Sequence, residues 1–170
     1  LDAQFFNNSY FKEMQAETQI ATKWLAEVLG EPEWCKGYGV RNTHTMAMMP
    51  TMSTAAIMGG ISQGIEPMIG ACFVQSNAGG ETERINPVFL DLMKKRGKFT
   101  KKLVKHIADN YGSVQDQDWL TDHEKLVFLT AYEIPQEVII RLADQRGRRI
   151  DQGKSLNIFV PSDAQEGYVE

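Results

Sequence analysis

Residues 41–67, RNTHTMAMMPTMSTAAIMGGISQGIEP, constrain the fold more than any other part of the chain. Residues 44–49 alternate as a short strand, and Pro50 then removes a ladder donor and ends it. The hydroxyl residues that follow stand where helix-capping residues belong, and a helix continues after them. Free backbone N–H groups and the positive end of the helix dipole would face one spot, which suits a phosphate group. The residues of this predicted phosphate site are Pro50, Thr51, Met52, Ser53 and Thr54.

The same turn has a simpler interpretation, in which an ordinary capped helix follows a strand and satisfies its own donors. It is not a Walker loop, because GxxxxGK[ST] is absent and no lysine stands nearby. If phosphate oxygens do bind here, each hydrogen bond to the charged group is worth ~1.5–3 kcal/mol. Spacing alone leaves both interpretations open.

The remaining sequence alternates predicted helices with a few short strands. Periodicity and capping signals predict helices over residues 9–29, 87–95, 100–111, 120–132 and 136–146. Strands are predicted over residues 44–49, 71–76 and 155–160, and residues 81–85 return as a hairpin partner after a turn at 77–80. This mixture predicts an α/β or α+β fold. The strands are too few to close a barrel, so we expect that a remainder of the domain is missing.

Composition excludes several classes of function. The 170 residues carry a net charge of −4, which argues against a general nucleic-acid binder. A basic run interrupts this acidity, and we interpret it as a solvated helix surface made by Lys94, Lys95, Arg96, Lys98, Lys101, Lys102 and Lys105. No apolar run reaches the ~18 residues of a membrane span, and no signal peptide opens the chain. These features favour a cytoplasmic protein.

Cysteines and histidines offer no catalytic or metal site. Cys35 and Cys72 lie far apart without CxxC spacing, so we expect small buried hydrophobic side chains rather than nucleophiles or a disulfide. His44, His106 and His123 have no partner at metal-ligand spacing. We therefore predict no bound metal. The segment RIDQGKSLNIF at 149–159 combines polar groups with a strand, and we interpret it as a strand entrance held by side-chain to backbone hydrogen bonds.

Several motifs resemble one known family in the correct order. MPTMSTAAIMGG…GIEP resembles the MPTASTxQI…SIEP segment of the large (α) subunit of class I ribonucleotide reductase, and RIDQGKSLNIF resembles its IDQSQSLNLF strand. SNAGGETERINPVFLDLMKKRG is similar to the family's SGEF…NPxLLxxL hairpin and helix. The piece GSVQDQDWLTDHEKLVFLTAYEI is most similar to phage-type members. The resemblance covers nearly the whole chain.

The resemblance implies a fold and a role for the turn. The family has a ten-stranded α/β barrel, so residues 1–170 would be a fragment of the C-terminal part of this catalytic domain, without an internal domain boundary. The turn at Pro50–Thr54 would bind the diphosphate of a ribonucleoside diphosphate. Met52 departs from the family, which often has a small residue there. No Asn-x-Cys-x-Glu segment for the radical cysteine is present, and we find neither the family's tyrosine pair nor its C-terminal cysteine pair, so the fragment alone should be inactive.

The resemblance also implies partners that lie outside this chain. They are the ribonucleoside diphosphate, the rest of the large subunit, a small subunit with a metal-radical cofactor, thioredoxin or glutaredoxin as reductant, and ATP or dNTP effectors bound elsewhere. This segment itself would bind no cofactor, nucleic acid or membrane. The alternatives are a fragment of a class II reductase, a non-catalytic phosphate-binding module, and a helical interaction module without a ligand.

Overall fold

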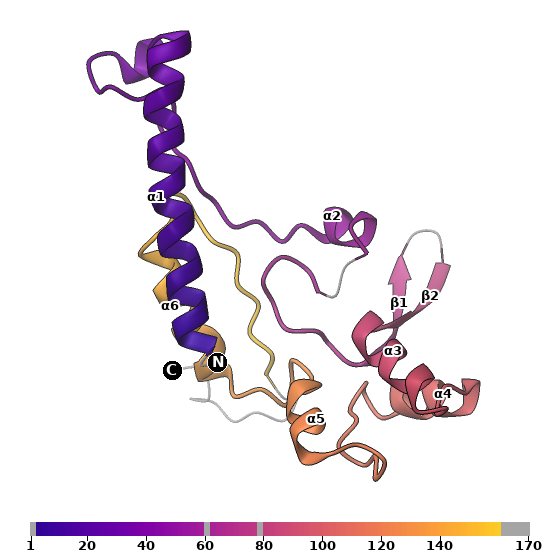
Figure 1. Cartoon of the computed structure of the whole chain (residues 1–170). Helices are drawn as coiled ribbons and strands as arrows, with labels where there is room; N and C mark the ends of the chain where they lie inside the picture. Colours follow the sequence, from indigo (N-terminus) through magenta and orange to yellow (C-terminus); the bar gives the residue numbers. More distant parts are fainter. Residues whose placement is uncertain (1–2, 60–61, 78–79, 161–170) are drawn as a thin grey trace. The chain divides into compact units, whose positions relative to one another are not determined.

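The computed structural model describes residues 3–59, 62–77 and 80–160 (Figure 1). Its elements, in chain order, are α1 (Ala3–Leu29), a 3-10 helix (Glu33–Cys35), α2 (Met52–Ile57), β1 (Cys72–Asn77), β2 (Gly80–Ile85), α3 (Pro87–Lys95), α4 (Lys101–Asp109), α5 (Asp122–Val127) and α6 (Gln136–Gly147). The chain divides into two compact units. The first comprises residues 1–50 with 137–156, and the second comprises residues 51–136 with 157–170.

In the first unit, α1 and α6 are joined by a small buried polar cluster. The side-chain amide of Asn7 donates to the Leu142 carbonyl at 3.2 Å and to Gln145 Oε1 at 3.1 Å. Its Oδ1 accepts a 3.2 Å bond from Nη1 of Arg146, a residue that is only 5% exposed. Burial lowers the pKa of this guanidinium, because leaving water disfavours the charged form. The amide of Asn7 therefore supplies the acceptor that the buried Arg146 needs.

The predicted helix over residues 9–29 is confirmed, although α1 begins earlier, at Ala3. Apolar residues that recur at three- and four-residue intervals, among them Phe11, Met14 and Val28, predict a buried stripe on this helix, and the face that it buries differs from that stripe. Asn7, Phe11 and Thr22 are buried, whereas Met14 and Val28 of the predicted stripe are exposed. The buried residues are four and eleven positions apart, and both spacings stay on one helix face, so this face is defined by polar as well as apolar residues.

Residues 45–48 and 151–155 of the first unit run side by side as a short parallel contact. Asp151 holds its start, because its carboxylate accepts the Thr45 and Met46 N–H groups at 2.8 and 2.9 Å. The Met48 N–H donates to the Gly153 carbonyl at 3.2 Å, and the Ser155 N–H donates to the Met48 carbonyl at 3.0 Å. The interpretation of residues 149–159 as held by side-chain to backbone bonds is confirmed at Asp151.

The predicted strands over residues 44–49 and 155–160 are wrong in extent. Among the described residues, the one isolated bridge is parallel and pairs Met48 with Lys154, which precedes the second predicted strand. A strand needs a neighbour that continues the ladder, and local alternation does not supply one. From Asn157 onward the backbone N–H groups bond to side chains instead, since Asn157 donates to Glu66 and Phe159 donates to Gln136.

The second unit contains an antiparallel hairpin packed on helices. β1 pairs with β2 in a register that sets Cys72 opposite Ile85 and Val74 opposite Glu83, which confirms the predicted hairpin; the predicted turn at 77–80 includes residues outside the described range. Asn86 then caps α3 by accepting the Val88 and Phe89 N–H groups, with Pro87 at the first helical position. The buried core of this unit comprises Ala71, Cys72, Phe89, Met93, Val104, Ile107, Val114, Leu120 and Phe128.

The helices at 100–111 and 136–146 are confirmed within two residues as α4 and α6. The predicted helix at 120–132 is shorter, because α5 ends at Val127. Its start is the expected capping box between Thr121 and Glu124. Thr130 and Glu133 form a second reciprocal pair, in which the Thr130 N–H donates to Glu133 Oε2 and the Glu133 N–H donates to Thr130 Oγ1. This second pair starts a new turn and so ends the first helix early.

Candidate functional site

The predicted phosphate turn lies at the start of α2. Thr51 is the N-cap residue, with a left-handed backbone at φ 50° and ψ 35°. Its side chain does not cap the helix; instead Thr51 Oγ1 accepts the Gly64 N–H at 2.9 Å. The first intrahelical bond runs from the Ala55 N–H to the Thr51 carbonyl at 2.8 Å. The backbone N–H groups before Ala55 therefore have no partner within the helix.

This geometry places four of the five predicted residues together. Thr51 to Thr54 form the N-cap and first turn of α2, and the side chains of Ser53 and Thr54 are exposed. Pro50 precedes them as the last residue of the first unit. The simpler interpretation required the helix to satisfy its own donors, and Thr51 does not do so. First-turn N–H groups, two hydroxyl groups and the positive end of a helix are groups that bind an anion.

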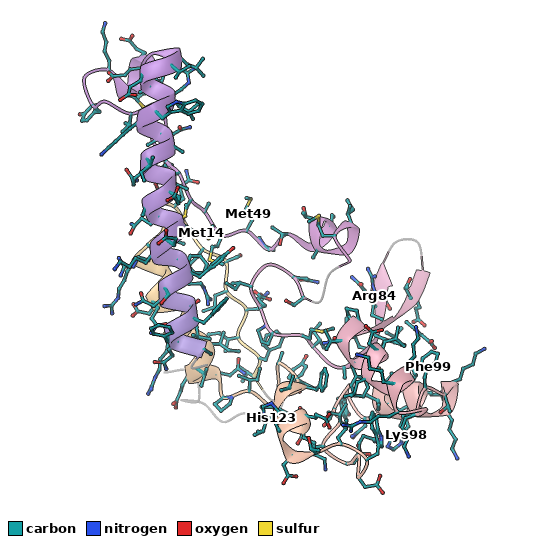
Figure 2. All side chains as sticks on the ribbon, viewed as in Figure 1. Met14, Met49, Arg84, Lys98, Phe99 and His123 are labelled. Carbon is teal, nitrogen blue, oxygen red and sulfur yellow. The ribbon has the colours of Figure 1, made fainter. Side chains whose placement is uncertain are left out.

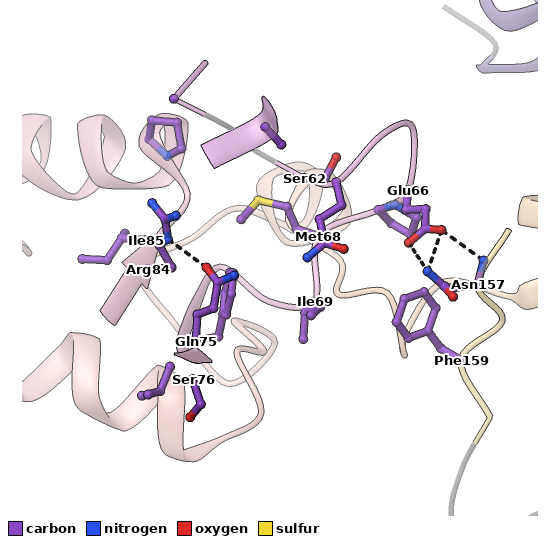
Figure 3. Close-up of a pocket in the computed structure, with 17 residues that line it drawn as sticks. Ser62, Glu66, Met68, Ile69, Gln75, Ser76, Arg84, Ile85, Asn157 and Phe159 are labelled. Atoms are coloured by element: carbon purple, nitrogen blue, oxygen red, sulfur yellow. Dashed lines mark hydrogen bonds between the residues drawn. The ribbon is translucent and has the colours of Figure 1, made fainter. Parts of the chain in front are cut away.

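A cavity of about 490 Å³ lies beside α2 within the second unit (Figure 3). Its size is within the range of small-molecule sites. Its lining combines apolar and polar groups, and Arg84 Nε on β2 donates to Gln75 Oε1 on β1 at 3.1 Å. Ala55 and Gly59, which follow the turn, form part of its wall. The polar residues of the lining are Ser62, Gln63, Glu66, Gln75, Ser76, Arg84 and Asn157.

Glu66 and Asn157 form the densest polar contact of this cavity (Figure 3). The Asn157 backbone N–H donates to Glu66 Oε1 at 3.0 Å, and Asn157 Nδ2 donates to Oε1 and Oε2 at 2.8 Å each. Sequence reasoning gave Glu66 no role. No local signal could have paired the two, because 91 residues separate them.

Neither cysteine is a reactive thiol. Both Cys35 and Cys72 are free and buried. Burial, and to a smaller extent the charge of Glu83, raise the pKa of Cys72 to about 12, so its thiol stays protonated at neutral pH. The prediction that both are small buried side chains rather than nucleophiles is confirmed by these positions. No group of three or more His, Cys, Asp or Glu side chains that could hold a metal ion occurs among the described residues.

The basic run is an exposed surface on α3, α4 and the loop between them, where Figure 2 marks Lys98 and Phe99. Arg96 makes a bidentate pair with Glu124, with distances of 2.9 and 2.7 Å. Lys105 lies 3.7 Å from Asp109 on the same helix. The interpretation as a solvated helix surface is therefore confirmed. Over the described part of the chain, no helix is long and apolar enough to cross a membrane.

Comparisons with known proteins agree on one family. The family described as "Ribonucleotide reductase, barrel domain" matches residues 4–170. A protein of Frog virus 3 (isolate Goorha) described as "Putative ribonucleoside-diphosphate reductase large subunit" is 37% identical over 151 residues, which cover 89% of this chain and 26% of that protein. The large subunit of Caenorhabditis elegans is 35% identical over 130 residues, covering 76% of this chain and 16% of its own length.

A solved structure gives the same answer for the fold. The class Id ribonucleotide reductase alpha subunit of Actinobacillus ureae matches with a TM-score of 0.82 and 40% sequence identity, over 94% of this chain and 29% of that chain. The chain thus spans about a quarter of the length of the curated viral relative. The prediction of a partial α/β barrel of this family is confirmed. The chain belongs to the ribonucleotide reductase family, and its residues 4–170 correspond to part of the large subunit's barrel domain.

Proposed function

We propose that this chain is part of a ribonucleoside-diphosphate reductase large subunit and binds the substrate's diphosphate through the turn Pro50–Thr54. The observation that carries the proposal is the start of α2, where, within the described part of the chain, Thr51 Oγ1 accepts the Gly64 N–H and does not cap the helix. Backbone N–H groups at a helix start without a side-chain cap bind anions in many proteins. The names of the relatives, which are ribonucleoside-diphosphate reductases, supply the chemical class of the anion.

The contribution of the turn is binding and orientation. A diphosphate carries at least two negative charges, and the first-turn N–H groups with the Ser53 and Thr54 hydroxyls would offer hydrogen bonds without a counter-charge. Each bond to the charged phosphate is worth ~1.5–3 kcal/mol. Holding the diphosphate at one end fixes the ribose at a constant distance from the turn, which favours reaction at one position.

The reducing chemistry requires groups outside these residues. Cys72, with its raised pKa, does not offer a thiolate at neutral pH, and Cys35 is buried. We infer that the radical cysteine belongs to another segment of the large subunit. A small subunit would supply a metal-based radical, and thioredoxin or glutaredoxin would supply electrons in the cytoplasm.

The test is a charge placed in the turn of the complete large subunit assayed with its small subunit. Ser53→Asp puts a carboxylate beside the bound phosphate, and repulsion at ~4 Å should raise the KM for CDP about tenfold or more. Lys98→Gln, at an exposed position between α3 and α4, lowers the net charge by the same amount elsewhere and should leave KM unchanged. An unchanged KM in Ser53→Asp, with the protein folded, would contradict the assignment.

A further inference from the structure

The loop after α2 is held at two points, one at each end of a short stretch. Gly64 donates its N–H to Thr51 Oγ1 at 2.9 Å, which ties the loop to the N-cap of α2. Two residues later, Glu66 accepts three bonds from Asn157 at 2.8–3.0 Å. The loop thus joins the start of α2 to a residue far along the chain.

Asn157 is itself fixed, through its neighbours, to the same part of the second unit. The Phe159 N–H donates to Gln136 Oε1 at 2.8 Å, and the Phe159 ring meets Tyr132 edge-on with centroids 5.3 Å apart. Gln136 Nε2 donates to the Ala131 and Ile134 carbonyls at 3.0 and 2.8 Å. Residues 157–159 are therefore attached to residues 131–136 by polar and aromatic contacts.

A final bond closes these contacts into a ring. The Ala131 N–H donates to the Met68 carbonyl at 2.7 Å, two residues beyond Glu66. Glu66 and Met68 are therefore both hydrogen-bonded to residues of this ring, Glu66 to Asn157 and Met68 to Ala131. Among the described residues of this ring, Glu66 is the one with an acidic side chain, and its two oxygens accept all three Asn157 bonds. A carboxylate accepts hydrogen bonds at both oxygens without donating any, which matches the donors that Asn157 presents.

The left-handed backbone of Thr51 explains why the loop needs a firm attachment. A β-branched residue at φ 50° is strained by about 1–3 kcal/mol and persists only where its surroundings impose it. The described bond that engages its side chain comes from Gly64, in the loop that Glu66 anchors. If the loop were no longer held, the backbone of Thr51 could relax to a less strained conformation. The first N–H groups of α2 would then no longer point towards one position.

We propose that Glu66, with Asn157 as its partner, is a positioning residue that holds the Thr51–Thr54 turn in its anion-binding shape. The inference rests on the proposed function, because it concerns the same diphosphate site. Glu66 acts through Gly64 and Thr51 and does not itself bind the diphosphate, which its charge would repel. Its loss should raise KM for the diphosphate substrate more than it lowers kcat.

The test exchanges the two partners in the complete large subunit, assayed with its small subunit and CDP. Glu66→Gln sets an amide against the Asn157 amide, and Asn157→Asp sets two carboxylates against each other. Each single variant should raise KM for CDP about two- to tenfold, the range expected for lost hydrogen bonds. The double variant Glu66→Gln with Asn157→Asp restores a donor opposite an acceptor and should recover most of the loss. Glu81→Gln, on exposed β2, is the matched control.

A second readout keeps folding defects separate from the proposed role. Amide hydrogen exchange of residues 52–55 should quicken in both single variants and slow again in the double variant, while exchange in α3 stays constant. If KM and exchange are unchanged in Glu66→Gln although Ser53→Asp raises KM, the positioning role is overturned and the diphosphate site stands. If Ser53→Asp also leaves KM unchanged, the proposed function fails, and the positioning role fails with it. If the double variant loses as much binding free energy as the two single variants together, the pairing of Glu66 with Asn157 is overturned.

Discussion

Gly70 and Gly112 let two backbone segments of the second unit cross at a distance that no side chain would allow. A Cβ on Gly70 would lie 2.6 Å from Gly112 Cα, and a Cβ on Gly112 would lie 2.5 Å from Gly70 Cα. Gly112 also has φ +77°, a backbone that favours glycine. The crossing is reinforced by the Ala71 N–H, which donates to the Gly112 carbonyl at 2.9 Å. Two glycines therefore set how closely the strand β1 approaches the end of α4.

Gly70→Ala should destabilise the protein by about 1–3 kcal/mol, because the added methyl group meets backbone atoms that cannot rotate away. The thermal unfolding midpoint of the complete large subunit would report the loss. Gly153→Ala is the control, since a Cβ there meets nothing within 4 Å. Equal midpoints for the two variants would show that the backbone crossing is looser than described.

At the scale of elements, the predicted capping box at Thr121 is confirmed, whereas α1 begins at Ala3 and not at residue 9, and the side chain of Thr51 does not cap α2. Asn86 and Thr100 also cap the helices predicted after them. Their signals succeed because the capping side chain and its N–H partner are two or three residues apart. The predicted strands failed where the partner is remote, as for Met48 and Lys154. The candidate site divides in the same way: the turn at Thr51 could be predicted, whereas the contact of Glu66 with Asn157 could not.

The contact between residues 45–46 and 151 should weaken in acid. The Met46 N–H is the main cause that lowers the pKa of Asp151; slight burial opposes it, and the Thr45 amide and hydroxyl add to the lowering. A carboxyl with a lowered folded-state pKa stabilises fully above its unfolded pKa of about 3.9. That stabilisation is lost as the pH falls through the folded-state pKa.

The thermal midpoint difference between the wild type and Asp151→Asn should therefore be largest near pH 6 and shrink towards pH 3. The asparagine keeps the shape of the side chain but carries no charge at either pH. Asp118→Asn, at an exposed position, serves as the control and should give a small difference throughout. A pH-independent difference for Asp151→Asn would mean that its charge does not stabilise this contact.

At the scale of the whole molecule, the chain exposes apolar side chains that a complete domain would cover. On α1, Phe5, Phe6 and Trp24 are 65%, 60% and 57% exposed. The chain covers 29% of the solved alpha subunit that it matches, so most of the length of that subunit lies outside the match. Exposed aromatic groups in this number are typical of surfaces that pack against other protein.

The 170-residue chain produced alone should bind a hydrophobic dye and self-associate. Co-expression with the remaining parts of the large subunit should lower both signals, because those parts would cover α1. Dye fluorescence and light scattering measure the two effects. Replacing Phe6 and Trp24 by serine should lower the dye signal more than Tyr111→Ser, a similarly exposed aromatic in the second unit. Equal dye signals from the two variants would mean that the surface that binds the dye does not lie on α1.

The pairing of Met46 with Asp151 has a consequence for how the protein is made. Their 105-residue separation means that the ribosome must synthesise the whole second unit up to α6 before this contact can form. At ~5–20 residues per second, that interval lasts roughly 5 to 20 seconds. During this interval α1 has been synthesised but its partner α6 has not, whereas the hairpin of β1 and β2 and the helix α3 can already fold. Nascent chains stalled before residue 137 should therefore be clients of ribosome-associated chaperones.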